Sequence, residues 1–276
     1  MPLDWIRFLE LAGLGLIAST WGALIGAGGG FIIVPFLLFF DRSLSPAVVT
    51  AVSLIAVFSN GVSGAIAYAR LRRIDYRTGL VFLVATLPGG VVGARLVNHI
   101  DRGPFQVVFG ILLVIVSLYI FARPRRPAQA RVASSGSPRH LVDSRGTVYE
   151  YAVRLGPGAG ITFIIGFLAS MLGVGGGIFG VPVFVYLLGI PILVATATSQ
   201  FMLIGTSGVA NITNILEGDI HGLWATALAL TVGAVIGGQI GARISQRIST
   251  VWVARALAAG LLLVGLRLAY GGISTL

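Results

Sequence analysis

The sequence predicts an all-α polytopic membrane protein built from two inverted-topology repeats. Three observations lead to this fold class. Of the 276 residues, 56% are hydrophobic and only 10% are charged, whereas soluble domains carry roughly 25% charged residues. Apolar stretches that read as membrane helices cover most of the chain, and no single soluble core could use so many of them. A glycine-rich motif also occurs twice.

The apolar spans form two sets of five. The start, MPLDWIRFLE, lacks the pattern of a cleaved signal peptide, so we expect it to open the first mature helix. The spans are predicted at about 5–25, 31–40, 46–69, 78–98 and 104–122, and then at 155–172, 178–189, 191–216, 222–243 and 251–272. Each repeat is therefore expected to hold a glycine-broken re-entrant or half-length helix and about three full transmembrane helices.

Three pairs of matching segments, in the same order and about 147 residues apart, indicate an internal duplication. This predicts a first transmembrane repeat over 1–122 and a second over 155–276. The pairs are GAGGGFIIVP (26–35) with GVGGGIFGVP (173–182), SPAVVTAVS (45–53) with PILVATATS (191–199), and PGGVVGARL (88–96) with IGGQIGARI (236–244).

Residues 123–154 separate the repeats and contain seven arginines and three prolines without a helical period. We predict a mobile, cytoplasmic linker. Loop 70–77 holds four more arginines two spans earlier, so the positive-inside rule places it on the same, cytoplasmic side. Its counterpart at 216–224 has two acids and no arginine, and counting spans puts it outside. The repeats are therefore expected to have inverted topology.

The net charge of +10 comes from arginines in loops between apolar spans. This placement favours contact with the lipid bilayer over nucleic acid. The absence of cysteine excludes disulfides and thiolate metal sites. No metal or cofactor is predicted, and the sequence leaves open whether the chain forms a homo-oligomer.

The glycine runs predict an anion-binding site. Span 31–40 is about 15 Å long at ~1.5 Å per residue, half a bilayer. Non-helical backbone at that depth is tolerated only within protein or beside a wet cavity. The amides that follow each run form a helix N-terminus, which attracts anions. The predicted ligand groups are those of Gly28, Gly29, Gly30, Gly175, Gly176 and Gly177. The alternative is that the glycines only permit close helix packing.

Polar side chains within the spans supply further candidate ligands. Asn and Gln are costly in lipid, so Asn60, Gln200 and Asn211 are the best candidate donors, whereas hydroxyl groups often bond to their own helix. The hydroxyl candidates are Thr50, Ser53, Thr196 and Ser199. No Asp, Glu or His is predicted at a span centre, which favours an anionic substrate over a proton or sodium site.

Arg95 and Arg243 occupy equivalent positions near the ends of their spans. One interpretation is that they extend to the membrane interface, helped by the helix dipole. The other is that each gates or attracts an anion at one mouth of a pathway.

The two GxGGGxxxxP motifs, SGAIAYARLRRIDYR (63–77) and GARL/GARI together resemble the TauE/SafE family, over essentially the whole chain except the linker. The resemblance implies an integral membrane transporter of sulfite, organosulfonates or other small sulfur-containing anions. A departure at LEGDIHG, with His221, and the long linker leave the substrate open.

The leading functional hypothesis is a secondary transporter of such anions by alternating access, as inverted repeats are typical of this class. The alternative is an anion channel on the same scaffold. An intramembrane enzyme is not expected, because no nucleophile–base pair or ligand cluster lies within the spans. We expect a multi-pass protein of the bacterial inner membrane.

Overall fold

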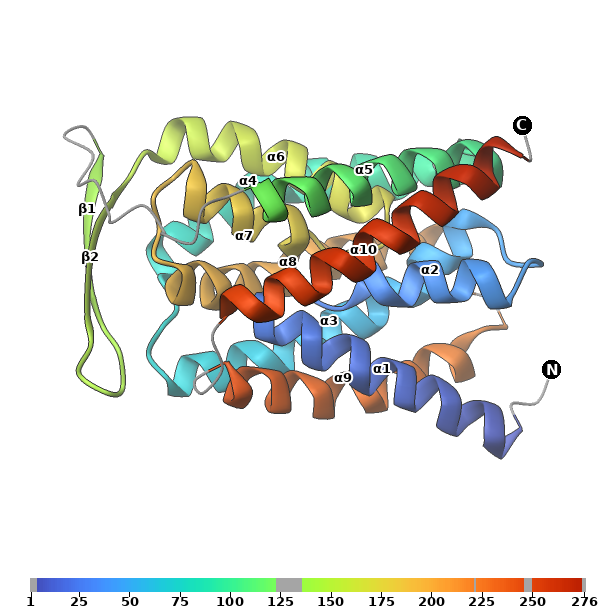
Figure 1. Cartoon of the computed structure of the whole chain (residues 1–276), viewed down its shortest axis with the longest axis horizontal. Helices are drawn as coiled ribbons and strands as arrows, with labels where there is room; N and C mark the ends of the chain where they lie inside the picture. The colour runs from blue at the N-terminus through green and yellow to red at the C-terminus, as the bar shows by residue number, and fades with distance from the viewer. Residues whose placement is uncertain (1–3, 123–135, 221, 246–249, 275–276) are drawn as a thin grey trace.

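The computed structural model describes residues 4–122, 136–220, 222–245 and 250–274. Ten α-helices dominate this part of the chain, and they lie side by side in an elongated bundle (Figure 1). Six of the described helices are long and apolar enough to cross a membrane. This confirms the prediction of an all-α polytopic membrane fold.

In both halves the second helix is short and the other helices are longer. The first half contains α1 (Trp5–Ile25), α2 (Gly30–Phe40), α3 (Pro46–Arg70), α4 (Tyr76–Leu96), a 3-10 turn (Val97–His99) and α5 (Arg102–Ala122). The second contains α6 (Leu155–Met171), α7 (Gly177–Tyr186), α8 (Ile192–Glu217), α9 (Trp224–Ile244) and α10 (Thr250–Ile273). Helix α7 ends three residues before the predicted boundary, because Gly189 adopts a positive φ of 70° after the last turn.

The prediction of a mobile linker is wrong for its second part. Strands β1 (Ser137–Val142) and β2 (Val148–Val153) form an antiparallel hairpin in which Ser137 faces Val153. The sequence VYEYAV of β2 is rich in β-branched and aromatic residues, which favour strands, and the search for a helical period overlooked it. Residues 123–135 lie outside the described residues.

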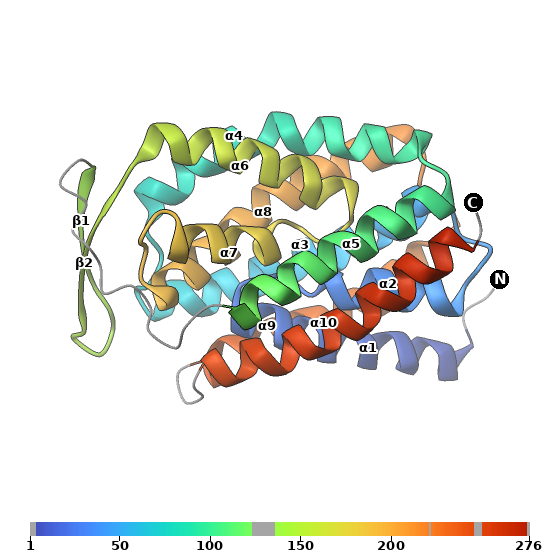
Figure 2. The same cartoon turned by 45° about the horizontal axis from the view of Figure 1, so that its top comes forward.

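The two halves pair crosswise. Helix α1 packs along α9, and its counterpart α6 packs along α4, while α3 meets α8 and α5 meets α10 (Figure 2). If each helix is replaced by its counterpart in the other half, the pair α1–α9 becomes the pair α6–α4. The pairs α3–α8 and α5–α10 are unchanged. This is the arrangement that a two-fold relation between repeats requires.

The third repeated motif explains the crosswise pairs. A Cβ atom on Gly89 would lie 2.2 Å from Phe163 O in α6, and one on Gly237 would lie 2.5 Å from Leu16 O in α1. Gly93 and Gly241 make the same approach one turn later, to Phe167 O and Thr20 O. Small residues in membrane helices permit such backbone contact. The PGGVVGARL and IGGQIGARI motifs therefore act as packing surfaces.

Loops that correspond in the two repeats lie at opposite ends of the bundle. The α3–α4 loop contacts the hairpin, since Ser144 N donates to Leu71 O over 3.0 Å. The end of α8 meets the other end of α4, where Glu217 Oε1 lies 3.6 Å from Arg95 Nε. The described part of the second arginine-rich segment, 136–154, lies at the same end as the 70–77 loop, as predicted (Figure 1), and the assignment of that end to the cytoplasm stays a prediction.

Candidate functional site

The two glycine loops meet at the centre of the bundle. A Cβ on Gly177 would lie 1.8 Å from Gly26 O, and one on Gly30 would lie 2.3 Å from Gly173 O. Only a residue without a side chain fits at either position. Helix α2 returns from this crossing toward the end of the bundle where α1 begins (Figures 1 and 2). The loops are re-entrant tips buried within protein, as the cost of exposing backbone to lipid requires.

One serine from the opposite half holds each tip. Ser53 Oγ in α3 donates to Gly173 O over 2.8 Å, and Ser199 Oγ in α8 donates to Gly26 O over 3.0 Å. Both serines are buried. These positions correspond in the internal repeat, so the two bonds are the same contact made twice.

Each tip ends in a helix N-terminus, as predicted. Gly29 caps α2 with φ of 89° and Gly176 caps α7 with φ of 95°. The first bonds within the α7 turn are donated by Phe179 and Gly180 to Gly176 O. The amides of Gly177 and Ile178 precede these bonds, and they belong to the N–H groups that helix geometry leaves without an intrahelical acceptor.

A small cavity of about 10 Å³ lies at the N-terminus of α7. A cavity of about this size holds one water molecule. Its lining contains hydroxyl groups from α4 and α8 and no acidic or basic side chain. The lining residues are Thr86, Ile165, Gly175, Gly176, Gly177, Gly180, Phe184, Ser199, Met202, Leu203 and Thr206.

The space at the second tip reflects larger side chains on α6 than on α1. In the first half, a Cβ on Gly22 of α1 would lie 2.2 Å from Gly29 N, so α1 closes directly onto the tip. The equivalent residue of α6 is Ala169, whose Cβ would lie 3.4 Å from a Cβ on Gly176. Ile165, one turn earlier and part of the cavity lining, places its Cγ2 atom 3.5 Å from the same Cβ, so side chains of α6 and not its backbone meet the second tip.

The predicted amide donors are engaged with protein. Gln200 Nε2 donates to Asn60 Oδ1 over 2.8 Å, and Asn60 Nδ2 donates to Gly28 O over 2.9 Å, which links α8 through α3 to the first tip. Asn211 Nδ2 donates to Leu54 O. Asn60 and Gln200 thus position the first tip, and Asn211 joins α8 to α3.

The two threonines predicted as ligands differ in their hydrogen bonding. Thr50 Oγ1 donates to Ala47 O in its own helix, while the buried Thr196 Oγ1 has no hydrogen-bond partner in the described part of the chain. Of all the predicted ligand residues, the structure brings Gly175, Gly176, Gly177 and Ser199 to the cavity.

The two threonines that line the cavity were not predicted as ligands. The hydroxyl oxygens of Thr86 and Thr206 lie 3.1 Å apart, which joins α4 to α8 beside the α7 N-terminus. The repeat contained a signal for Thr206, because the 146-residue offset places it opposite the candidate Asn60. No such signal exists for Thr86, whose repeat counterpart is Ala234.

The candidate gate residues lie far from the tips. Arg95 is in the last turn of α4 and Arg243 in the last turn of α9, and these helices end at opposite ends of the bundle (Figure 1). Both side chains are exposed, and Arg95 pairs with Glu217. A gating role at two mouths stays a prediction.

The hairpin is fixed to the α3–α4 loop by two buried ion pairs. Arg73 Nη2 lies 3.0 Å from Asp143 Oδ2, and Arg139 Nε lies 3.4 Å from Asp75 Oδ2. Tyr151 in β2 adds a hydroxyl that donates to Asp75 Oδ2 over 2.8 Å. The loop and the hairpin thus each contribute one acid and one arginine to the two ion pairs.

The charge on Asp143 is favoured by its neighbours. Burial opposes ionisation, but N–H donors from Arg145 and Thr147 and the Arg73 guanidinium outweigh it and lower the pKa of the carboxyl group. Burial next to Asp75 raises the pKa of Tyr151, which therefore stays a hydroxyl donor. At neutral pH Asp143 is therefore ionised and Tyr151 is protonated, which are the states that their bonds to the loop require.

Replacing Arg73 should release the hairpin. We expect Arg73→Met to cost about 3 kcal/mol, because it leaves the buried Asp143 carboxylate unpaired near the aqueous end of the bundle. Trypsin should then cut after Arg139, which is buried in the intact contact. Mass spectrometry of the fragments measures this cleavage. The neighbouring Arg72→Met removes an exposed charge and should leave Arg139 protected; equal cleavage in both variants would contradict the assignment.

Ten helices in the described part of the chain, two crossing re-entrant tips and a buried polar centre define a polytopic membrane protein of the transporter class. The chain belongs to the sulfite exporter TauE/SafE family, whose model matches residues 11–268. No solved structure matches the chain.

Relatives with assigned names agree with this class. The chain is 35% identical over 275 residues to the probable membrane transporter protein YunE of Bacillus subtilis, covering 97% of this chain and 99% of the relative. It is 24% identical over 221 residues to a probable membrane transporter protein of Xylella fastidiosa, covering 80% and 78%. It is 25% identical over 210 residues to YfcA of Escherichia coli, also a probable membrane transporter, covering 76% and 70%. The chain is therefore a multi-pass membrane transporter and not an enzyme.

Proposed function

We propose that the chain is a secondary transporter that moves a small anion by alternating access. The proposed substrate is sulfite, a sulfonate or a related sulfur-containing organic anion, a class supported by the family description. The observation that carries the proposal is the cavity at the α7 N-terminus, which combines helix N–H groups with hydroxyls and has no acid in its lining. Such groups stabilise an anion without a charged side chain.

The small volume of the cavity supports a binding site that changes shape during transport. A sulfite ion has three oxygens around sulfur and needs more space than the single water molecule that fits here. Entry therefore requires the tips to separate from α8 and α4. Inverted repeats with broken helices at their interface commonly work by rocking one part against another, and the crosswise packing of the halves is suited to this motion.

We assign closure of the cytoplasmic side to the hairpin. Tyr151 and Val153 pack in one apolar cluster with Phe184 and Met202, and the latter two also line the cavity. Asp75, which binds the hairpin, donates its backbone N–H to Thr198 Oγ1 in α8 over 3.0 Å. Opening the cavity toward that end would displace the hairpin, while Arg95 and Arg243 would attract anions at the two mouths.

Flux through purified protein in liposomes tests the proposal. We expect labelled sulfite or taurine to accumulate, and unlabelled substrate on the opposite side to accelerate exchange. Protein-free liposomes are the control. A large conductance without such counterflow would instead favour the anion channel, and the absence of flux for every sulfur oxyanion by correctly folded protein would refute the substrate class.

A further inference from the structure

We propose that the groove between α1, α2 and α10 binds one anionic phospholipid, with an acyl chain in the groove and the phosphate at Arg267. This inference concerns a site remote from the substrate cavity and does not depend on the proposed function.

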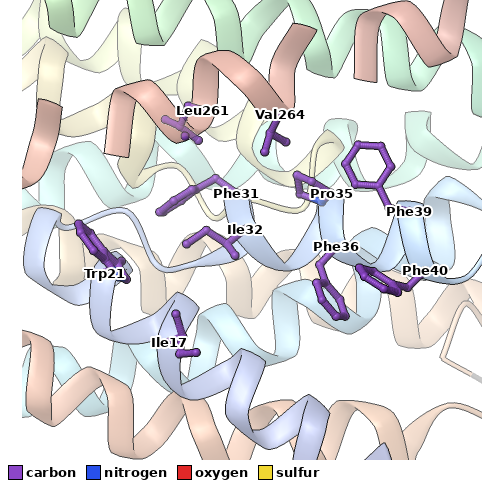
Figure 3. A pocket seen from close by; sticks show the side chains of 11 residues that line it. Ile17, Trp21, Phe31, Ile32, Pro35, Phe36, Phe39, Phe40, Leu261 and Val264 are labelled. Carbon is purple, nitrogen blue, oxygen red and sulfur yellow. The ribbon is translucent and has the colours of Figure 1, made fainter. Parts of the chain in front are cut away.

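The groove is large and apolar. Its volume is about 370 Å³, and all of its lining side chains are hydrocarbon or aromatic (Figure 3). Trp21 and Ile17 of α1 form one wall, and Leu261 and Val264 of α10 form the other, with α2 as the floor. Within a bilayer such a space is filled by hydrocarbon, since nothing polar lines it for water to bind.

A positively charged guanidinium group lies at one end of the groove. Arg267 of α10 places its guanidinium carbon 4.9 Å from the centre of the Phe39 ring, which is part of the lining. The Arg267 side chain is exposed, so its hydrogen-bond donors remain accessible to a phosphate. A guanidinium stacked on an aromatic ring is pre-organised to bind a phosphate oxygen pair.

Two neighbouring charged side chains are already engaged with groups of the protein. Arg102 donates to Arg42 O and Leu44 O, each over 2.8 Å, which holds the loop after α2 against α5. Asp41 in the same loop is already paired with Arg7 at 3.2 Å. The guanidinium of Arg267 therefore complements an anionic headgroup without competition from Asp41.

The groove also reaches the glycine motif. Phe31 and Pro35, both within GAGGGFIIVP, line its floor, and Phe31 follows the first tip directly. A bound acyl chain would therefore pack against the helix that carries the tip. The lipid contacts a half-helix that the transport cycle is proposed to move.

Trp21 provides the test. A Trp5→Phe/Trp224→Phe/Trp252→Phe protein retains Trp21 as its single tryptophan. Bromine on acyl chains quenches tryptophan at contact distance. The protein is placed in bilayers of one fixed mixture of phosphatidylglycerol and phosphatidylcholine. The bromine is carried either by phosphatidylglycerol or by an equal amount of phosphatidylcholine.

We expect brominated phosphatidylglycerol to occupy the groove about fivefold more readily than its share of the bilayer, which corresponds to one arginine near an anionic headgroup. Arg267→Gln should remove this preference, whereas Arg77→Gln, an exposed arginine at the other end of the bundle, should retain it. If the triple variant fails to fold, the difference between the native chain and Trp21→Phe gives the same comparison.

Two results would overturn the inference. Equal quenching by both brominated lipids would show that acyl chains fill the groove without selection for an anionic headgroup. No quenching of Trp21 by either lipid would show that protein, such as a second copy of the chain, covers the groove.

Discussion

Transport should stop when a disulfide joins the hairpin to the α3–α4 loop, and a reducing agent should restore it. The protein for this experiment carries Leu71→Cys and Ser144→Cys. The backbone bond between these residues, 3.0 Å from Ser144 N to Leu71 O, brings their Cα atoms within reach of a disulfide. The chain has no cysteine of its own, so no other disulfide can form. If the hairpin must leave for the cytoplasmic side to open, the oxidised protein should show only the flux of empty liposomes.

A control pair of cysteines within the hairpin distinguishes the effect of locking the hairpin to the loop from the effect of oxidation itself. His140 and Glu150 face each other across the hairpin and are exposed, so His140→Cys/Glu150→Cys joins the two strands without attaching them to the loop. This variant should transport equally well when oxidised and reduced. Unchanged flux in the oxidised Leu71→Cys/Ser144→Cys protein, with the disulfide verified by mass spectrometry, would contradict the gate assignment.

Thr206→Val should weaken substrate binding by about tenfold or more, because a hydrogen bond to a charged group contributes about 1.5–3 kcal/mol. Valine has nearly the same shape and lacks only the hydroxyl that lines the cavity. The substrate concentration for half-maximal flux should rise accordingly.

Thr213→Val is the control for this change. Thr213 lies on the same helix and, like Thr206, donates to the carbonyl four residues back, over 3.0 Å to Val209 O, but it does not line the cavity. We expect its transport kinetics to match those of the native chain. Similar losses in both variants would indicate a general weakening of α8.

Most of the fold was predictable because membrane helices follow from hydropathy and length. The duplication added the order of long and short helices. It also identified the serines that hold the tips, since Ser53 and Ser199 correspond in the repeat. The predicted anion role of Asn60 and Gln200 was harder to judge, because the sequence does not reveal that their donors bond to each other and to the first tip.

The difference between the tips was not predicted, since both carry the same glycine motif. It depends on residues outside the motif, since α6 presents the side chains of Ala169 and Ile165 where α1 approaches its tip with its backbone. The hairpin was missed for a different reason. Its charged residues Arg139 and Asp143 indicate a solvated loop until their partners Asp75 and Arg73 are located.

The central claim is that a small anion binds at the N-terminus of α7. Thermal unfolding of the purified protein with sulfite, sulfate, taurine or sulfoacetate tests this most directly, because a ligand that binds only the folded state raises the melting temperature. We predict that at least one of the sulfur-containing anions raises the melting temperature of the native chain and of Thr213→Val, and raises that of Thr206→Val much less. An equal rise in all three proteins, or no rise with any of these anions, would contradict the claim.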